Sequence, residues 1–253
     1  MTWQALVLAG ERPEGDPLAA TENAPAKAFV EIGGKPMISY VLDALAAVPA
    51  IGSVTVTISP SAPTLPSGLW ERIEAARSGP SESVLRGLET LGTPLLVTTA
   101  DHPMLSSATV EAFLQKAKAS GADVIAGVAR GEVAARAKGA PARTVIRFRD
   151  GGITGCNLFA LMSPEARGVI AFWQRLEAMR KRPASLALAV GPLVAARFKA
   201  GILTLAEAEA AIARKTGVRV ATVMLDDPLA AHDVDKPDHL AFARQVMSGK
   251  WQS

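Results

Sequence analysis

Short apolar runs alternate with amphipathic segments along the first half of the chain, and this alternation limits the fold more than any other feature. Residues 4–8 form a short, largely apolar run, as expected of a strand buried inside a parallel sheet. Residues 37–48 carry apolar side chains at helical spacing after Pro36, and the β-branched run 53–58 predicts the next strand. A strand, a helix and a strand in this order predict a right-handed parallel crossover.

The same pattern continues to residue 128. After a proline-rich loop over residues 59–68, we expect helices over residues 83–91 and 106–118 and strands over residues 94–99 and 123–128. The alternation predicts an α/β fold, with an open, doubly wound, mostly parallel sheet and helices on both faces.

The second half of the chain departs from this alternation. Two strands, over residues 143–148 and 157–161, flank the turn Asp150-Gly151-Gly152, which favours a hairpin. Helix-start signals then predict three helical segments, over residues 163–180, 185–199 and 204 onward. A last strand over residues 218–223 and a closing helix over residues 237–247 follow. We expect a single domain over residues 1–253 with a helical insert at about 163–214.

Composition excludes several classes of protein. Cys156 is the only cysteine, so an intramolecular disulfide and a four-cysteine zinc site are ruled out, and we expect a small buried side chain there. The net charge of +3 is mild, and the basic group between Arg130 and Arg149 contains one aromatic residue, Phe148, so nucleic acid is a poor fit. The apolar runs are too short for a signal peptide or a membrane span, which favours a cytoplasmic protein.

The loop after the first strand has the features of a phosphate-binding element. It is rich in glycine, proline and charge, and it leads to Lys27 and to a Gly-Gly-Lys-Pro turn at residues 33–36. Donor-rich loops with nearby cations bind polyphosphate. We therefore expect a nucleoside triphosphate to bind here.

Two aspartates from distant segments favour a magnesium site. Asp101 directly follows the predicted strand 94–99, at the sheet edge where α/β proteins bind ligands, and Asp235 precedes the closing helix. The alternatives are structural, because Asp101 could cap the helix after Ser106 or form a turn, and Asp235 could cap its own helix. Asp233 is the second choice, expected to point away from Asp235 if the segment is extended.

Five short motifs occur in an order that resembles the nucleotidyltransferase family. They are Leu-Val-Leu-Ala-Gly near the N-terminus, Pro25-Ala26-Lys27-Ala28, Gly34-Lys35-Pro36-Met37, Ala100-Asp101-His102-Pro103 and the run from Asp233 to Leu240. The chain looks like the molybdenum-cofactor guanylyltransferase-like (MobA-like) branch, and also resembles sugar-phosphate and isoprenoid cytidylyltransferases. The resemblance spans nearly the whole chain and is weakest over residues 130–220.

The resemblance implies a Rossmann-like fold and a Mg²⁺-dependent transfer of a nucleoside monophosphate from a triphosphate to a phosphate-bearing small molecule or lipid, with release of pyrophosphate. Lys27 and Arg12 would stabilise charge on the phosphates, and Asp101 and Asp235 would bind the metal. Nucleotide contacts would come from Leu8, Ala9, Gly10, Gly79, Ser83 and Ala100, and the acceptor would meet Asn157.

The phosphate loop also departs from the family pattern. Glu11 stands where these proteins usually have a second glycine, and acidic residues follow as far as Asp16. A glutamate does not adopt the backbone conformations of glycine at low cost. This leaves an alternative function, a nucleotide-binding regulator that retains the fold without turnover.

The predicted helical insert carries more apolar residues than one amphipathic face requires. They are Leu186, Leu188, Val190, Leu193, Val194, Phe198, Ile202 and Leu203. One explanation is a subdomain that packs on the sheet or on a second copy in a homodimer. The other is an apolar acceptor, such as a lipid phosphate, reached by peripheral contact with a membrane.

Overall fold

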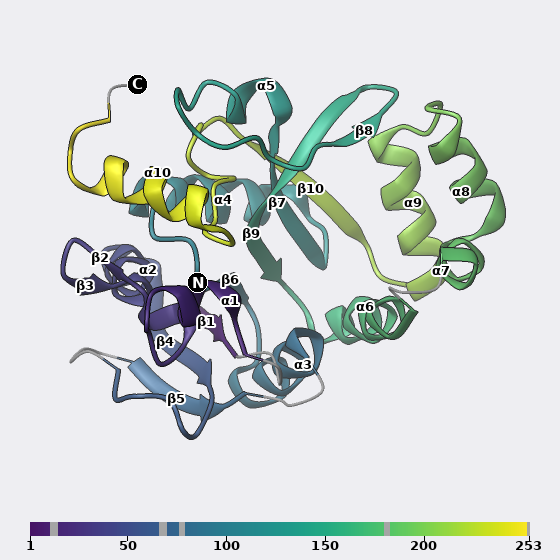
Figure 1. The fold of residues 1–253 in the computed structure, drawn as a ribbon. Helices are drawn as coiled ribbons and strands as arrows, with labels where there is room; N and C mark the ends of the chain where they lie inside the picture. Colours follow the sequence, from purple (N-terminus) through teal and green to yellow (C-terminus); the bar gives the residue numbers. More distant parts are fainter. Residues whose placement is uncertain (11–14, 66–69, 76–78, 180–182, 252–253) are drawn as a thin grey trace.

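The computed structural model describes residues 1–10, 15–65, 70–75, 79–179 and 183–251. Its centre is an eight-stranded sheet in the order β10-β7-β9-β6-β1-β4-β5, with β8 paired to β9 (Figure 1). The strands are β1 (Trp3–Ala9), β4 (Ile51–Ile58), β5 (Trp70–Glu74), β6 (Leu95–Thr99), β7 (Val124–Arg130), β8 (Ile146–Phe148), β9 (Gly151–Leu161) and β10 (Val220–Leu225).

Parallel pairing dominates the sheet, as the sequence predicts. β1 pairs in parallel with β4 and β6, β4 with β5, and β10 with β7. The exception is β9, which runs antiparallel between β6 and β7. The prediction of a mostly parallel α/β sheet is therefore confirmed, with one inserted antiparallel strand.

Helices cover both faces because β1 alternates its side chains between two cores. Ala5 and Val7 belong to a core cluster shared with α2 (Met37–Ala46) and α4 (Ser107–Ser120). Leu6 belongs to a second cluster, shared with α3 (Pro80–Leu91) and α6 (Arg167–Met179). The closing helix α10 (Pro237–Met247) packs in a third cluster with the segment around β2 (Glu31–Ile32) and β3 (Lys35–Pro36).

Several short elements connect this framework. They are α1 (Pro17–Thr21), the 3-10 turns η1 (Lys27–Phe29) and η2 (Pro164–Ala166), and α5 (Gly131–Ala134). Strand β5 was not predicted from the sequence, β9 was predicted only over its last residues, and β8 was predicted too long.

The predicted helical insert forms what we call the helical arm, composed of α6, α7 (Pro183–Val190), α8 (Pro192–Lys199) and α9 (Leu205–Thr216). Gly191, with a φ of +118°, separates α7 from α8, so the single helix predicted over residues 185–199 is two. The capping box at Thr204 is confirmed, since its hydroxyl accepts from the Glu207 amide and the Glu207 carboxylate accepts from the Thr204 amide. None of the described helices is long and apolar enough to cross a membrane.

Candidate functional site

Three segments far apart in the sequence meet at the carboxyl end of the sheet. Lys27 lies in η1, Asp101 follows β6, and Asp235 lies just before α10. The Lys27 Nζ lies 2.7 Å from Asp101 Oδ2 and 2.5 Å from Asp235 Oδ1. The Val234 amide also donates to the Asp101 carbonyl at 2.7 Å, which fixes the C-terminal segment against the end of β6. The structure thus brings together Lys27, Asp101 and Asp235.

Neither aspartate has the capping role considered as an alternative. Ser106 is the N-cap of α4 and accepts a hydrogen bond from the Thr109 amide at 3.1 Å. The N-cap position of α10 is Lys236, which makes no side-chain cap bond. Both carboxylates are therefore directed at Lys27 instead of at helix ends.

The charges of this group reinforce one another. Burial alone would lower the pKa of Lys27, but the charge and hydrogen bond of Asp101, with those of Asp235, outweigh it and raise that pKa. Burial alone would raise the pKa of Asp235, but Lys27 outweighs it and lowers that pKa. Both shifts favour the charged forms, an ammonium on Lys27 and a carboxylate on Asp235.

Asp233 belongs to the same cluster, and the expectation that it points away from Asp235 is wrong. Carboxylate oxygens of Asp101, Asp233 and Asp235 all lie within 4.8 Å of one another. Side chains two residues apart in an extended segment lie on the same face, so Asp233 and Asp235 are expected to point the same way and not in opposite directions.

Arg143 neutralises Asp233. Its Nη2 forms an ion pair with the Asp233 carboxylate, and its Nη1 donates to the Asp233 carbonyl at 3.2 Å and lies 3.3 Å from His239 Nδ1. Burial lowers the pKa of Arg143, against the charges of Asp235 and Asp101. From the sequence, Arg143 was one member of a general basic group and His239 had no assigned role, so both are additions from the structure.

The donor set fits a magnesium ion. Mg²⁺ takes oxygen ligands and is typically bound by one or two carboxylates together with substrate phosphates. Asp101 Oδ1 is buried and has no hydrogen-bond partner among the described residues, which leaves an oxygen available to a cation. Because Asp233 is held by Arg143, Asp101 and Asp235 are the carboxylates that could hold the ion.

The predicted nucleotide contacts lie at the ends of β1, β6 and the start of α3. The Leu8 carbonyl accepts from the Ala100 amide at 3.0 Å, which ties the ends of β1 and β6 together beside Ala9 and Gly10. Gly79 precedes α3 with a φ of +136°, and its carbonyl accepts from the Ser83 amide. Their roles toward a nucleotide stay predictions, and Arg12 and Glu11 lie outside the described residues.

Asn157 sits where β9 departs from regular pairing. The register moves from Ala126 opposite Phe159 to Val128 opposite Gly155, so β9 has extra residues at this point. Asn157 has a φ of +50°, one of the positive values that asparagine tolerates best. Bulges of this kind re-aim side chains next to binding sites, and contact of Asn157 with an acceptor stays a prediction.

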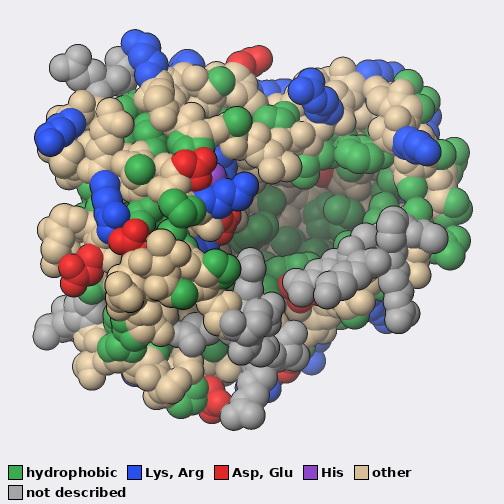
Figure 2. All heavy atoms as spheres, in the orientation of Figure 1, with side chains coloured by type: hydrophobic (Ala, Val, Ile, Leu, Met, Phe, Trp, Pro, Cys, Tyr) green, Lys and Arg blue, Asp and Glu red, His purple; other side chains and the backbone are tan. Residues whose placement is uncertain are grey.

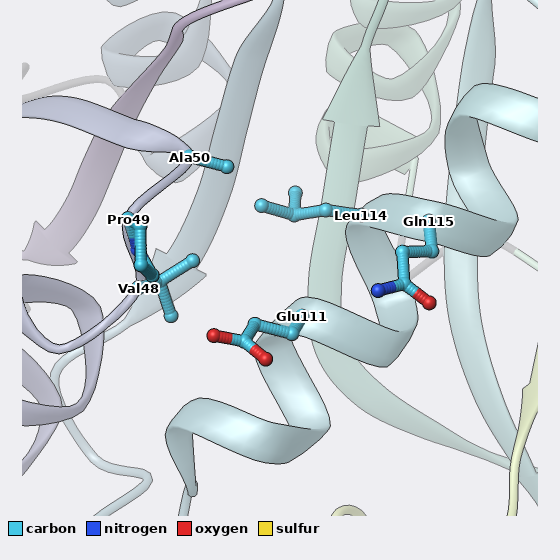
Figure 3. A pocket seen from close by; sticks show the side chains of 6 residues that line it. All are labelled: Val48, Pro49, Ala50, Glu111, Leu114 and Gln115. Carbon is cyan, nitrogen blue, oxygen red and sulfur yellow. The ribbon is translucent and has the colours of Figure 1, made fainter.

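The face of the molecule is hollowed beside the site. Figure 2 shows a depression between the side that carries α10 and the helical arm, with hydrophobic side chains on its floor; β9, β7 and β10 lie behind it in Figure 1. A separate pocket of about 210 Å³ lies between the start of β4 and α4 (Figure 3), lined by Val48, Pro49, Ala50, Glu111, Leu114 and Gln115. That pocket is at the amino end of β4, opposite the edge that carries Asp101.

Comparisons with known proteins agree with this fold. A structure described as a hypothetical transferase from Thermus thermophilus is 32% identical, has a TM-score of 0.81 and covers 95% of this chain and 100% of its own. A CMP:2-keto-3-deoxy-manno-octonic acid synthetase complexed with CTP is 15% identical with a TM-score of 0.61, and covers 99% of this chain and 100% of its own. A 2-C-methyl-D-erythritol 4-phosphate cytidylyltransferase from Thermus thermophilus is 17% identical with a TM-score of 0.53. It covers 98% of this chain and 100% of its own.

The comparison with family models agrees with the structural one, whereas no curated protein matches the chain. Residues 5–216 match the MobA-like NTP transferase domain family, a range that contains Lys27, Asp101 and Arg143 and ends before Asp233 and Asp235. The chain therefore belongs to the MobA-like NTP transferase family.

Proposed function

We propose that the protein is a Mg²⁺-dependent nucleotidyltransferase that moves a nucleoside monophosphate from a nucleoside triphosphate to a phosphate-bearing acceptor. The observation that carries this proposal is the contact of Lys27 with both Asp101 and Asp235 at the carboxyl end of the sheet. A cation-binding pair of carboxylates beside a lysine is what phosphoryl chemistry requires, because the protein's main task is alignment and charge stabilisation.

In the proposed reaction an oxygen of the acceptor phosphate attacks the α-phosphorus of the triphosphate. The bond from the α-phosphorus to the bridging oxygen breaks, and pyrophosphate leaves with its electron pair. A Mg²⁺ ion held by Asp101 and Asp235 would supply positive charge against the phosphate oxygens. Lys27 would add a second positive charge, and the ends of β1 and β6 would orient the phosphates.

Arg143 has a supporting part in this proposal. By neutralising Asp233, it keeps the third carboxylate from adding an uncompensated negative charge beside the triphosphate. His239 supports the same arrangement, because its Nδ1 lies 3.3 Å from the Asp235 amide and 3.2 Å from the Asp233 carbonyl. Both residues position the carboxylates and need not touch the substrate.

The acceptor is proposed as a phosphorylated small molecule or a lipid phosphate. The solved relatives include a synthetase complexed with CTP and a cytidylyltransferase of an erythritol phosphate, which supports a triphosphate and a polar acceptor for this fold. The apolar floor of the hollow in Figure 2 supports an acceptor with an apolar portion.

Substitution of the two aspartates tests the proposal. Asp101→Asn and Asp235→Asn should each lower metal-dependent pyrophosphate release by roughly 10²–10³, the usual loss when one charge-stabilising contact is removed. Asp43→Asn is the matched control, since Asp43 is a surface aspartate that pairs with Lys35. Unchanged rates in folded Asp101 and Asp235 variants would remove the site assignment.

A nucleotide-binding regulator is the second candidate. Glu11, in the loop expected to surround the triphosphate, favours it, because a carboxylate there repels phosphate unless it faces away or binds metal. Tight triphosphate binding without pyrophosphate release, with any acceptor, would support the regulator over the enzyme.

A further inference from the structure

The helical arm exposes apolar side chains that the described chain leaves largely uncovered, although the Phe198 ring makes an edge-on contact with Phe148 of β8. Leu188 is 68% exposed and Leu193 73%, while Phe198 and Ile202 are 45% and 46% exposed. No residue of α8 is buried. These four make up half of the large hydrophobic residues found exposed among the described residues, although they occupy one short stretch. A subdomain that packed this stretch on the sheet would have buried at least one stripe of it.

A pocket beside these residues combines apolar walls with positive charge. It has a volume of about 560 Å³ and lies among α6, α7 and the C-terminal end of α9. Its apolar lining includes Phe172, Met179 and Leu188, and its cations are Arg175, Arg214 and Lys215. These cations make no side-chain hydrogen bond or ion pair with any residue that the structure describes, unlike Arg197, which is paired with Glu207.

Cations outnumber acidic residues among the described residues of the helical arm. The chain has no acidic residue between Glu177 and Glu207, whereas the described part of that interval contains Arg197 and Lys199. Both flanking glutamates are engaged, since Glu177 bonds to Ser81 and Glu207 caps α9 and binds Arg197. The surface thus offers apolar groups and an excess of positive charge together.

We propose that the helical arm docks on the surface of an anionic lipid bilayer. Leu188 and Leu193 would enter the region of the headgroups and acyl chains, while Arg175, Arg214 and Lys215 would contact lipid phosphates. Exposed apolar side chains flanked by Lys and Arg are the features that hold helices at a membrane interface, and each nearby cation adds attraction to anionic lipid.

Charge favours a bilayer over a second copy of the chain. A two-fold dimer contact joins the same surface of both subunits. With the two-fold axis near this pocket, the cations of one arm would lie near those of the other, and like charges at an interface oppose association. The bilayer surface instead supplies phosphates. The inference stands apart from the proposed function, because docking needs neither nucleotide nor metal.

Vesicle sedimentation tests the docking without any enzymatic readout. The chain of residues 1–253 should sediment with vesicles of equal parts phosphatidylglycerol and phosphatidylcholine, should bind pure phosphatidylcholine weakly, and should dissociate as salt rises. Leu188→Ser with Leu193→Ser, and separately Arg214→Gln with Lys215→Gln, should each weaken binding, the charge pair by roughly 10- to 30-fold at low salt.

Matched controls distinguish binding through the helical arm from non-specific binding to vesicles. Met247→Ser removes an exposed apolar residue of α10, and Lys118→Gln with Lys250→Gln removes two exposed cations elsewhere. These variants should bind as the wild type does. No binding to anionic vesicles at low salt, or equal binding by all variants, would overturn the proposal. A concentration-dependent dimer that Leu193→Ser abolishes, without vesicle binding, would assign this surface to a second copy instead.

Discussion

Lys27 occupies one oxygen of each aspartate that would hold a metal ion, so its removal should strengthen metal binding while it weakens catalysis. The Nζ lies 2.7 Å from Asp101 Oδ2 and 2.5 Å from Asp235 Oδ1. A divalent ion that bound these two oxygens would have to displace the ammonium, and an ion bound to the free Asp101 Oδ1 would still be repelled by the nearby ammonium. In Lys27→Met no ammonium has to move, and the two carboxylates are free to bind the ion.

The exposure of the three side chains sets the size of the effect on stability. The Lys27, Asp101 and Asp235 side chains are 19%, 20% and 45% exposed, so their pairs fall between surface and buried ones. We therefore expect Lys27→Met to lower the free energy of unfolding without metal by about 1–3 kcal/mol, between the values for surface and buried pairs. If displacement of the ammonium costs about 1.4 kcal/mol, the variant should bind the ion about tenfold more tightly.

Titration calorimetry with Mg²⁺ or Mn²⁺, without nucleotide, measures this affinity directly. Lys35→Met is the control, since Lys35 pairs with Asp43 away from the cluster and should leave metal affinity unchanged. Pyrophosphate release by Lys27→Met should fall by roughly 10²–10³. Metal binding that is unchanged or weaker in Lys27→Met would refute the competition between the lysine and the ion.

Three further predictions concern other parts of the chain. Burial raises the pKa of Cys156 to about 12, so its thiol should resist a thiol reagent at pH 8 until urea unfolds the protein; rapid stoichiometric labelling of the native form would contradict this. Hydrogen bonds, chiefly from the Thr204 amide, lower the pKa of Glu207 from 4.5 to about 2, so the stabilisation it gives is complete above pH 4.5 and is lost as pH falls toward 2. The free energy of unfolding of Glu207→Gln, measured in urea, should lack that pH dependence. Equal pH dependence of this free energy in variant and wild type would contradict the role of Glu207. Asn157→Gly should keep the wild-type melting temperature but raise the KM for the acceptor, whereas Asn157→Val should lower stability by about 1–2 kcal/mol because of the positive φ; a Val variant as stable as the wild type would disprove the strain.

The central strands could be predicted because burial on both faces favours runs of apolar and β-branched residues. This holds for β1, β4, β6 and β7, which have buried residues along most of their length. The edge strand β5 escaped prediction, because its sequence Trp-Glu-Arg-Ile-Glu is charged and partly exposed, as edge strands commonly are. The first half of β9 escaped for a different reason, since Gly151, Gly152 and Gly155 carry little strand propensity.

The candidate site could be predicted only where a local signal exists. Asp101 follows an apolar strand, and Lys27 lies in a motif, so both could be identified from the sequence. Arg143 could not, because its partner Asp233 lies 90 residues away and nothing nearby marks the pair. The position of Asp233 could have been predicted, because residues two apart in an extended chain share a face and Asp233 therefore lies beside Asp235.

Pyrophosphate release tests the central claim most directly. The wild type is incubated with each of the four nucleoside triphosphates, Mg²⁺ and a panel of sugar, polyol and isoprenyl phosphates, beside the Asp101→Asn variant. We predict release that requires both metal and acceptor, equals the nucleoside-diphosphate conjugate formed, and falls by roughly 10²–10³ in the variant. Tight triphosphate binding with no release under any combination, or equal release by Asp101→Asn, would contradict this claim.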